Sequence, residues 1–127
     1  MRQKVFRHIF RLHAFRESLS AAFKGVLYLF LFHRNMRIIF MLGFAALLLG
    51  ILLKLSGIEL IALCVTITLV FMAEIFNTAI EMLMNMLTAR FHMRIRIIKD
   101  IAAAVVVITC INALAIGYVL FIRRLFK

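Results

Sequence analysis

The chain has 127 residues, of which 66% are hydrophobic, and it carries a formal net charge of +11. Its mean hydropathy is +1.11. A soluble domain of this length does not need so much apolar surface, so the composition excludes an ordinary soluble protein and indicates a membrane protein. The positive charge suits anionic lipid better than nucleic acid, because no nucleic-acid-binding motif is present and the basic arm runs directly into an apolar segment.

Residues 1–35 alternate between basic and apolar side chains and become more apolar toward Phe32. This pattern predicts one or two amphipathic helices that lie on the cytoplasmic surface of the membrane. A cleavable signal peptide is not expected, because Glu17 interrupts a long basic region and no small-residue cleavage site follows.

Three apolar segments, residues 38–53, 58–87 and 97–122, are near or above the roughly 20 residues that a membrane-spanning helix needs. The sequence therefore predicts an all-α membrane protein with three transmembrane helices. The middle segment is longer than the bilayer core requires, so its polar end should emerge at one membrane surface.

Basic residues indicate how these helices are oriented. They gather before the first span and between the second and third spans, which places the N-terminus in the cytoplasm and the C-terminus outside. A basic tail after the third span is a mild departure from the rule. The two cytoplasmic groups are Arg2, Lys4, Arg7, Arg11, Arg16, Lys24, Arg34 and Arg37, and then Arg90, Arg94, Arg96 and Lys99, while the tail has Arg123, Arg124 and Lys127.

A polar stripe interrupts the end of the second span. Glu74, Asn77, Thr78 and Glu81 are spaced i, i+3, i+4 and i+7, so they share one helix face, which Asn85 extends by a turn. A carboxylate at membrane depth costs roughly 2.5 to 3.5 kcal/mol and usually marks a functional path. The alternative is that Glu74 only pairs with a basic residue for packing.

A second polar pair, Lys99-Asp100, starts the third span on the same side of the membrane. A lysine at a helix N-terminus, where free N–H groups and the helix dipole favour anions, suits a phosphate group. The following run of alanines, residues 102–104, would allow a helix or a nucleotide to approach closely, although helix packing alone also explains it. No Gly-rich phosphate loop, Ser-His-Asp triad or zinc pattern is present.

The motif Glu74-x-x-Asn77-Thr78-Ala79-Ile80-Glu81, followed by Lys99-Asp100-Ile101-Ala102-Ala103, resembles the small integral-membrane lipid kinases of bacteria. These are the diacylglycerol kinases and undecaprenol kinases, and the similarity runs from about Lys24-Gly25 to the end of the third span. The resemblance implies one membrane-embedded lipid-kinase-like domain over residues 1–127, in the bacterial inner (cytoplasmic) membrane. It further implies a homotrimer with active sites between subunits, which transfers the γ-phosphoryl group of Mg-ATP to a lipid alcohol such as undecaprenol or diacylglycerol.

The same resemblance implies a role for each polar residue. Glu74 would be the general base on the lipid hydroxyl, Glu81 a ligand of Mg²⁺, and Asn77 a support for that site. Lys99 would meet the ATP phosphates and Asp100 would contact the nucleotide. Such an arrangement suits phosphoryl transfer, which needs charge neutralisation, alignment and a positioned base more than covalent help.

Two positions differ from the family pattern. His33 stands where the family usually has a metal-binding glutamate, and Asn85 stands where many relatives have aspartate. Each change removes one negative charge from the expected metal site, and an imidazole suits Mn²⁺ better than Mg²⁺. A catalytically weakened relative, acting as a lipid-binding or assembly subunit, is therefore the alternative function.

Overall fold

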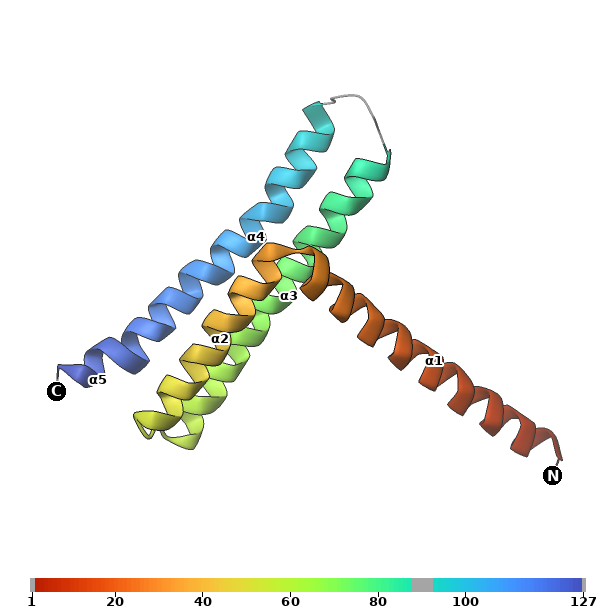
Figure 1. Cartoon of the computed structure of the whole chain (residues 1–127), viewed down its shortest axis with the longest axis horizontal. Helices are drawn as coiled ribbons and strands as arrows, with labels where there is room; N and C mark the ends of the chain where they lie inside the picture. The colour runs from red at the N-terminus through yellow and green to blue at the C-terminus, as the bar shows by residue number, and fades with distance from the viewer. Residues whose placement is uncertain (1, 88–92, 127) are drawn as a thin grey trace. The chain divides into compact units, whose positions relative to one another are not determined.

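The computed structural model describes residues 2–87 and 93–126, and the side chains of residues 14–87 and 93–126. The described chain is helical throughout, apart from short turns (Figure 1). It divides into two units, Met1–Arg34 and Asn35–Lys127. The prediction of an all-α protein is confirmed.

The first unit consists of α1 (Arg2–Phe32), a single unbroken helix where the sequence left one or two helices open. It ends at His33, whose backbone N–H donates a hydrogen bond of 2.9 Å to the carbonyl of Leu29. Large apolar side chains are exposed along its second half: Phe15, Leu19, Phe23, Val26, Leu27, Leu31 and Phe32. Its position on a membrane surface stays a prediction.

The second unit holds α2 (Arg34–Leu52), α3 (Gly57–Leu87) and α4 (Met93–Gly117). A π-helical turn η1 (Tyr118–Ile122) and the short α5 (Arg123–Leu125) continue α4 without a break. All three long helices are long and apolar enough to cross a membrane, which confirms the three predicted spans. The third is longer than predicted and reaches from Met93 to Leu125.

The turn between α2 and α3 is fixed by its backbone and by one capping pair. Lys54 has a positive φ of 51°, and the N–H groups of Lys54 and Leu55 bond back to Ile51 and Gly50, as in a Schellman ending. Ser56 and Glu59 then form a capping box, in which the Ser56 N–H donates to Glu59 Oε2 at 2.6 Å and the Glu59 N–H donates to Ser56 Oγ at 3.4 Å. The chain therefore reverses direction within a few residues.

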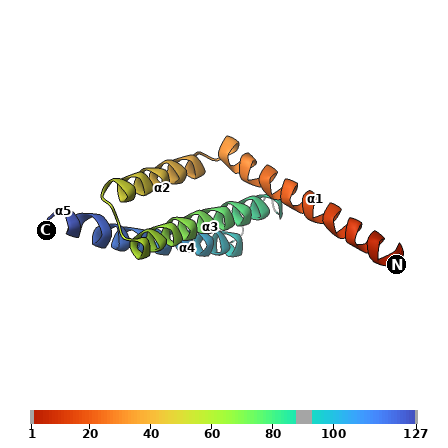
Figure 2. The same ribbon diagram turned by 90° about the horizontal axis from the view of Figure 1, so that it is seen from below.

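Glycines on α2 leave room for side chains of α3 and of the turn. A Cβ atom at Gly43 would lie 2.9 Å from Ile67 Cγ2, and one at Gly50 would lie 3.1 Å from side-chain atoms of Leu55 and Leu63. Helix α4 packs along α3 on another side, and the two run side by side in both views (Figure 1, Figure 2). Helix α3 is thus the central helix of this unit.

Polar contacts join the ends of the helices where α2 turns into α3. Arg124 donates one hydrogen bond of 3.1 Å to Glu59 Oε2, with which it also forms an ion pair, and another of 3.2 Å to the carbonyl of Lys54. We call this end of the second unit, with Lys54, Glu59 and Arg124, the turn end. The opposite end, which carries Asn85 and Lys99, is the Lys99 end.

Candidate functional site

The polar stripe predicted on the second span lies on α3 and is buried at its centre. Glu74 is only 4% exposed and Thr78 only 3% exposed. Within the described part of the chain, the Glu74 carboxylate makes no hydrogen bond or ion pair. The packing alternative, in which Glu74 pairs with a basic residue, is therefore not found among the described residues.

The stripe becomes more exposed toward the Lys99 end. Asn77 is half-buried, and Glu81 is exposed. Glu74 and Glu81 are seven residues apart on α3, so their backbone positions differ by about 10 Å along the helix axis. One acid is thus enclosed by protein while the other is accessible, on the same helix face.

Lys99 joins the stripe through Asn85. The Lys99 ammonium donates a hydrogen bond of 2.7 Å to Asn85 Oδ1, near the end of α3. Because α4 begins at Met93, Lys99 lies in its second turn, so the expectation that it sits at the free N–H groups of a helix N-terminus is wrong. The sequence placed both residues at the same membrane side but did not indicate their contact, because residues 14 positions apart meet only when the two helices are packed. The bond brings a cation within one helical turn of Glu81 along α3.

Asp100 takes no part in this contact, and His33 belongs to the other unit. Asp100 is exposed, and its carboxylate lies 4.0 Å from Arg96 Nε, one turn earlier on α4. His33 belongs to the first unit, where it is half-buried and its ring centroid lies 6.0 Å from that of Tyr28. Its proximity to Glu81 therefore stays a prediction.

The donors available for a metal ion are few. Among the residues that the structure describes, no three His, Cys, Asp or Glu side chains come together. Glu81 does offer an accessible carboxylate beside the amide oxygen of Asn85, on one helix face. Magnesium commonly takes one or two carboxylates and completes its shell with water and substrate phosphates, so these oxygen donors fit it.

The alanine run shows how closely α4 meets its neighbours. Ala102 is 5% exposed, whereas Ala103 and Ala104 are exposed. Helix packing therefore accounts for Ala102, the first alanine of the run. The other two remain accessible on the surface of the single chain.

Comparison with known proteins identifies the family of this chain. Residues 20–121 match the family described as prokaryotic diacylglycerol kinase. A diacylglycerol kinase from Synechocystis sp. is 35% identical over 101 residues, which cover 79% of this chain and 58% of that protein. An undecaprenol kinase from Bacillus subtilis is 30% identical over 118 residues, which cover 93% of this chain and 96% of that protein.

The chain thus spans little more than half the length of the Synechocystis relative, but nearly the full length of the Bacillus relative. The matched family segment contains all of α2, α3 and α4, and with them Glu74, Glu81 and Lys99. The chain belongs to the prokaryotic diacylglycerol kinase family.

Proposed function

We propose that this protein is a lipid kinase that transfers the γ-phosphoryl group of ATP to the hydroxyl of a membrane lipid alcohol, undecaprenol or diacylglycerol. One observation carries the proposal: a buried carboxylate, Glu74, and an accessible one, Glu81, lie on one face of α3 beside the Lys99–Asn85 contact. The names of the family and of both relatives support the same activity.

Glu74 is the general base in this proposal. It lies on a helix long and apolar enough to span the membrane, and the protein around it largely excludes water. A base of this kind takes the hydroxyl proton as the oxygen attacks phosphorus, and it contributes about a hundredfold or more to the rate.

The other substrate, ATP, is bound in this proposal by four residues of α3 and α4: Glu81, Asn77, Lys99 and Asp100. Glu81 would hold Mg²⁺, which supplies positive charge to the phosphates of ATP, and Asn77 would support that site. Lys99 neutralises phosphate charge as well, and it exchanges its contact with Asn85 for one with ATP. The axial offset of about 10 Å between Glu74 and Glu81 leaves room for the phosphate groups between base and metal ligand.

The proposed site faces the cytoplasm, where ATP is available. Basic residues support this orientation: Arg94, Arg96 and Lys99 lie at the start of α4, and Arg34 and Arg37 lie at the start of α2. The N-terminus is then cytoplasmic and the C-terminus outside, in the inner membrane of a bacterium. Both units, residues 1–127, form one lipid-kinase-like domain in this proposal.

A phosphoryl-transfer assay tests the proposal directly. The purified protein in lipid nanodiscs receives labelled ATP, with Mg²⁺ or Mn²⁺, and either undecaprenol or dioleoylglycerol. Phosphorylated lipid is the expected product with at least one of the two alcohols. Tight lipid binding without transfer under any of these conditions would instead identify a lipid-binding or assembly subunit.

We further propose that the working form is a homotrimer. A single chain already covers Glu74. Asn77 is still only half-buried and Glu81 exposed, however, and a neighbouring subunit would shield both. Native mass spectrometry from nanodiscs should show three copies, and a monomer with full activity would contradict the trimer.

His33 offers a test of metal use. If it lies at the metal site, replacing its imidazole by a carboxylate in His33→Glu should lower the Mg²⁺ concentration needed for half-maximal activity by about tenfold and reduce the advantage of Mn²⁺. His33→Gln is the matched control, because it adds no charge. Metal titrations that coincide for all three proteins would remove His33 from the metal site.

A further inference from the structure

Thr78 belongs to the polar stripe on α3 but has no task in the proposed reaction. It is buried, and it lies four residues after Glu74, one turn further along the same helix face. Within the described part of the chain, its hydroxyl makes no hydrogen bond. A buried hydroxyl without a partner destabilises a protein, so this position requires a reason other than packing.

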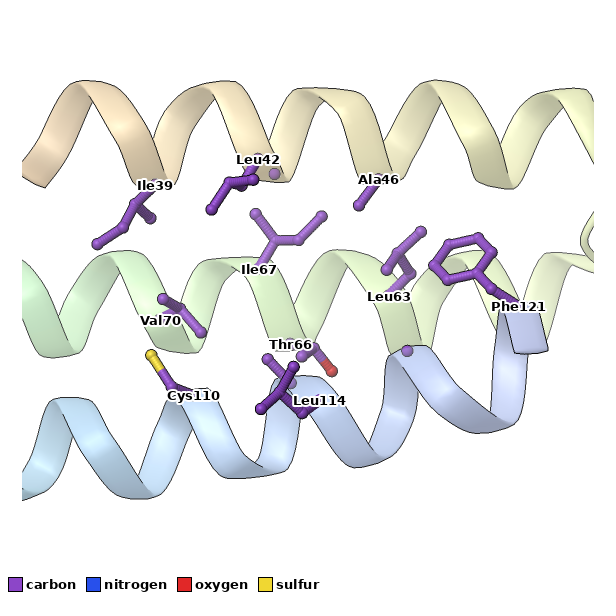
Figure 3. A pocket seen from close by; sticks show the side chains of 13 residues that line it. Ile39, Leu42, Ala46, Leu63, Thr66, Ile67, Val70, Cys110, Leu114 and Phe121 are labelled. Atoms are coloured by element: carbon purple, nitrogen blue, oxygen red, sulfur yellow. The ribbon is translucent and has the colours of Figure 1, made fainter. Parts of the chain in front are cut away.

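The other three threonines that the structure describes each have a partner. The hydroxyls of Thr66, Thr68 and Thr109 donate hydrogen bonds of 2.8 to 2.9 Å to backbone carbonyls three or four residues earlier in their own helices. Figure 3 shows Thr66 among largely apolar side chains of α2, α3 and α4, where a bond of this kind satisfies the hydroxyl. Thr78 departs from this pattern, so its hydroxyl is free to bind a ligand.

The neighbour of this free hydroxyl is a carboxylate that also has no partner among the described residues, Glu74. In the described part of the chain, every side-chain oxygen or nitrogen that is fully enclosed has a hydrogen-bond partner. The unpaired oxygens of Glu74 and Thr78 are therefore not fully enclosed. Both groups border space that a ligand can enter.

The two groups have complementary capacities for hydrogen bonds. An ionised carboxylate only accepts, whereas a threonine hydroxyl can donate. An alcohol has one O–H donor and two acceptor lone pairs, so a single alcohol group can donate to Glu74 and accept from Thr78 at the same time. Side chains at i and i+4 have Cβ atoms about 5–6 Å apart, a separation that one bridging oxygen with two hydrogen bonds can span.

We propose that Thr78 binds the acceptor alcohol: its hydroxyl donates to the oxygen of the lipid hydroxyl, which in turn donates to Glu74. The inference rests on the proposed lipid kinase activity. With its proton directed at Glu74 and one lone pair held by Thr78, the oxygen presents its other lone pair to phosphorus. In the transfer the alcohol proton passes to Glu74, the new oxygen–phosphorus bond forms, and the bond between the γ-phosphorus and ADP breaks. Thr78 keeps its own proton throughout.

Thr78→Val tests the proposal, because valine keeps the shape of the side chain and removes only the hydroxyl. Thr66→Val is the matched control, with the same change at a buried position of α3 whose hydroxyl is bonded to its own helix. With dioleoylglycerol or undecaprenol in nanodiscs, Thr78→Val should lower kcat/KM for the alcohol by about tenfold or more. Thr66→Val should stay within about twofold of the wild type, because it loses no ligand contact. Thr78→Ser, which keeps the hydroxyl, should retain most of the activity.

A lipid without the hydroxyl separates a contact with the alcohol from a packing effect. The deoxy analogue of the accepted lipid, in which hydrogen replaces the hydroxyl, has no oxygen for Thr78. It should therefore inhibit the wild type and Thr78→Val with the same inhibition constant, while the KM of the alcohol rises in the variant. Equal weakening of both lipids, or equal losses in Thr78→Val and Thr66→Val, would overturn the proposal. Wild-type kcat/KM in Thr78→Val would overturn it while leaving the kinase intact, whereas a wild type inactive on both alcohols would overturn the kinase itself.

Thermal unfolding of the ligand-free protein gives a readout independent of turnover. No partner of Thr78 among the described residues is left unsatisfied when its hydroxyl is removed. Thr78→Val should thus keep the Tm of the wild type or raise it by about 2 °C, even though it slows transfer. A lowered Tm, or a variant that does not fold, would show that the hydroxyl supports the structure and would overturn its assignment to the alcohol.

Discussion

Glu74→Gln is expected to lower phosphoryl transfer by about a hundredfold or more while the protein remains folded and inserted. The amide keeps the shape of the side chain but accepts a proton far less readily than a carboxylate. Because Glu74 is buried and forms no ion pair within the described residues, the neutral amide leaves no charged partner unsatisfied. The loss should therefore appear in kcat and not in the amount of folded protein.

Glu59→Gln is the matched control for this experiment. It makes the same chemical change near the other end of α3, where Glu59 accepts hydrogen bonds from Ser56 and Arg124. Its activity should stay near that of the wild type, because the amide oxygen of glutamine can still accept the hydrogen bonds from Ser56 and Arg124 and so keep the contact between the helices. Comparable losses in both variants, or full activity in Glu74→Gln on the best lipid, would show that Glu74 is not the base.

Lys99→Met should lower kcat/KM for ATP by about a hundredfold, because a positive charge aimed at the phosphates is lost. The cost in stability should be small, since Asn85 is exposed and water can replace the lost donor. Initial rates would be measured against ATP concentration at saturating lipid.

Arg94→Met is the control for Lys99→Met, as an exposed cation in the first turn of α4. It should change the rate little at physiological salt, because a solvated charge acts weakly over distance. Lys99→Arg should keep part of the activity. Equal effects of Lys99→Met and Arg94→Met would mean that the general positive charge of this end, and not a phosphate contact of Lys99, supports the reaction.

Much of this fold could be read from the sequence, because apolar length alone indicates three spans. The ends of the first and third spans differ by several residues from the prediction, because helices continue past the apolar segment into basic residues such as Arg34 and Arg94. The stripe around Glu74 was also visible, since helical spacing places residues on one face without any knowledge of neighbours. What the sequence left open depends on packing between helices. The Lys99–Asn85 bond and the burial of Thr78 both arise from the packing of α3 against its neighbours.

The basic tail after the third span is another feature whose role depends on packing between helices. Arg124 appeared in the sequence only as a charge on the less favoured side of the membrane. Its acidic partner, Glu59, follows the first span in the sequence, on the same side of the membrane as the tail. This pair of opposite charges was a signal that could have indicated the contact. In the structure Arg124 binds Glu59 and the carbonyl of Lys54, so its position serves a specific contact as well as topology.

That contact has a consequence for the axial register of α4 on α3. The surfaces between these helices are largely apolar, and apolar side chains alone resist sliding weakly in a lipid environment. Arg124 fixes the register from the turn end, and Lys99 lies 25 residues earlier on the same continuous helical stretch, about 37 Å away. A contact at one membrane surface thus sets the height at which the lysine at the other surface meets its ligand, even after Lys99 has released Asn85.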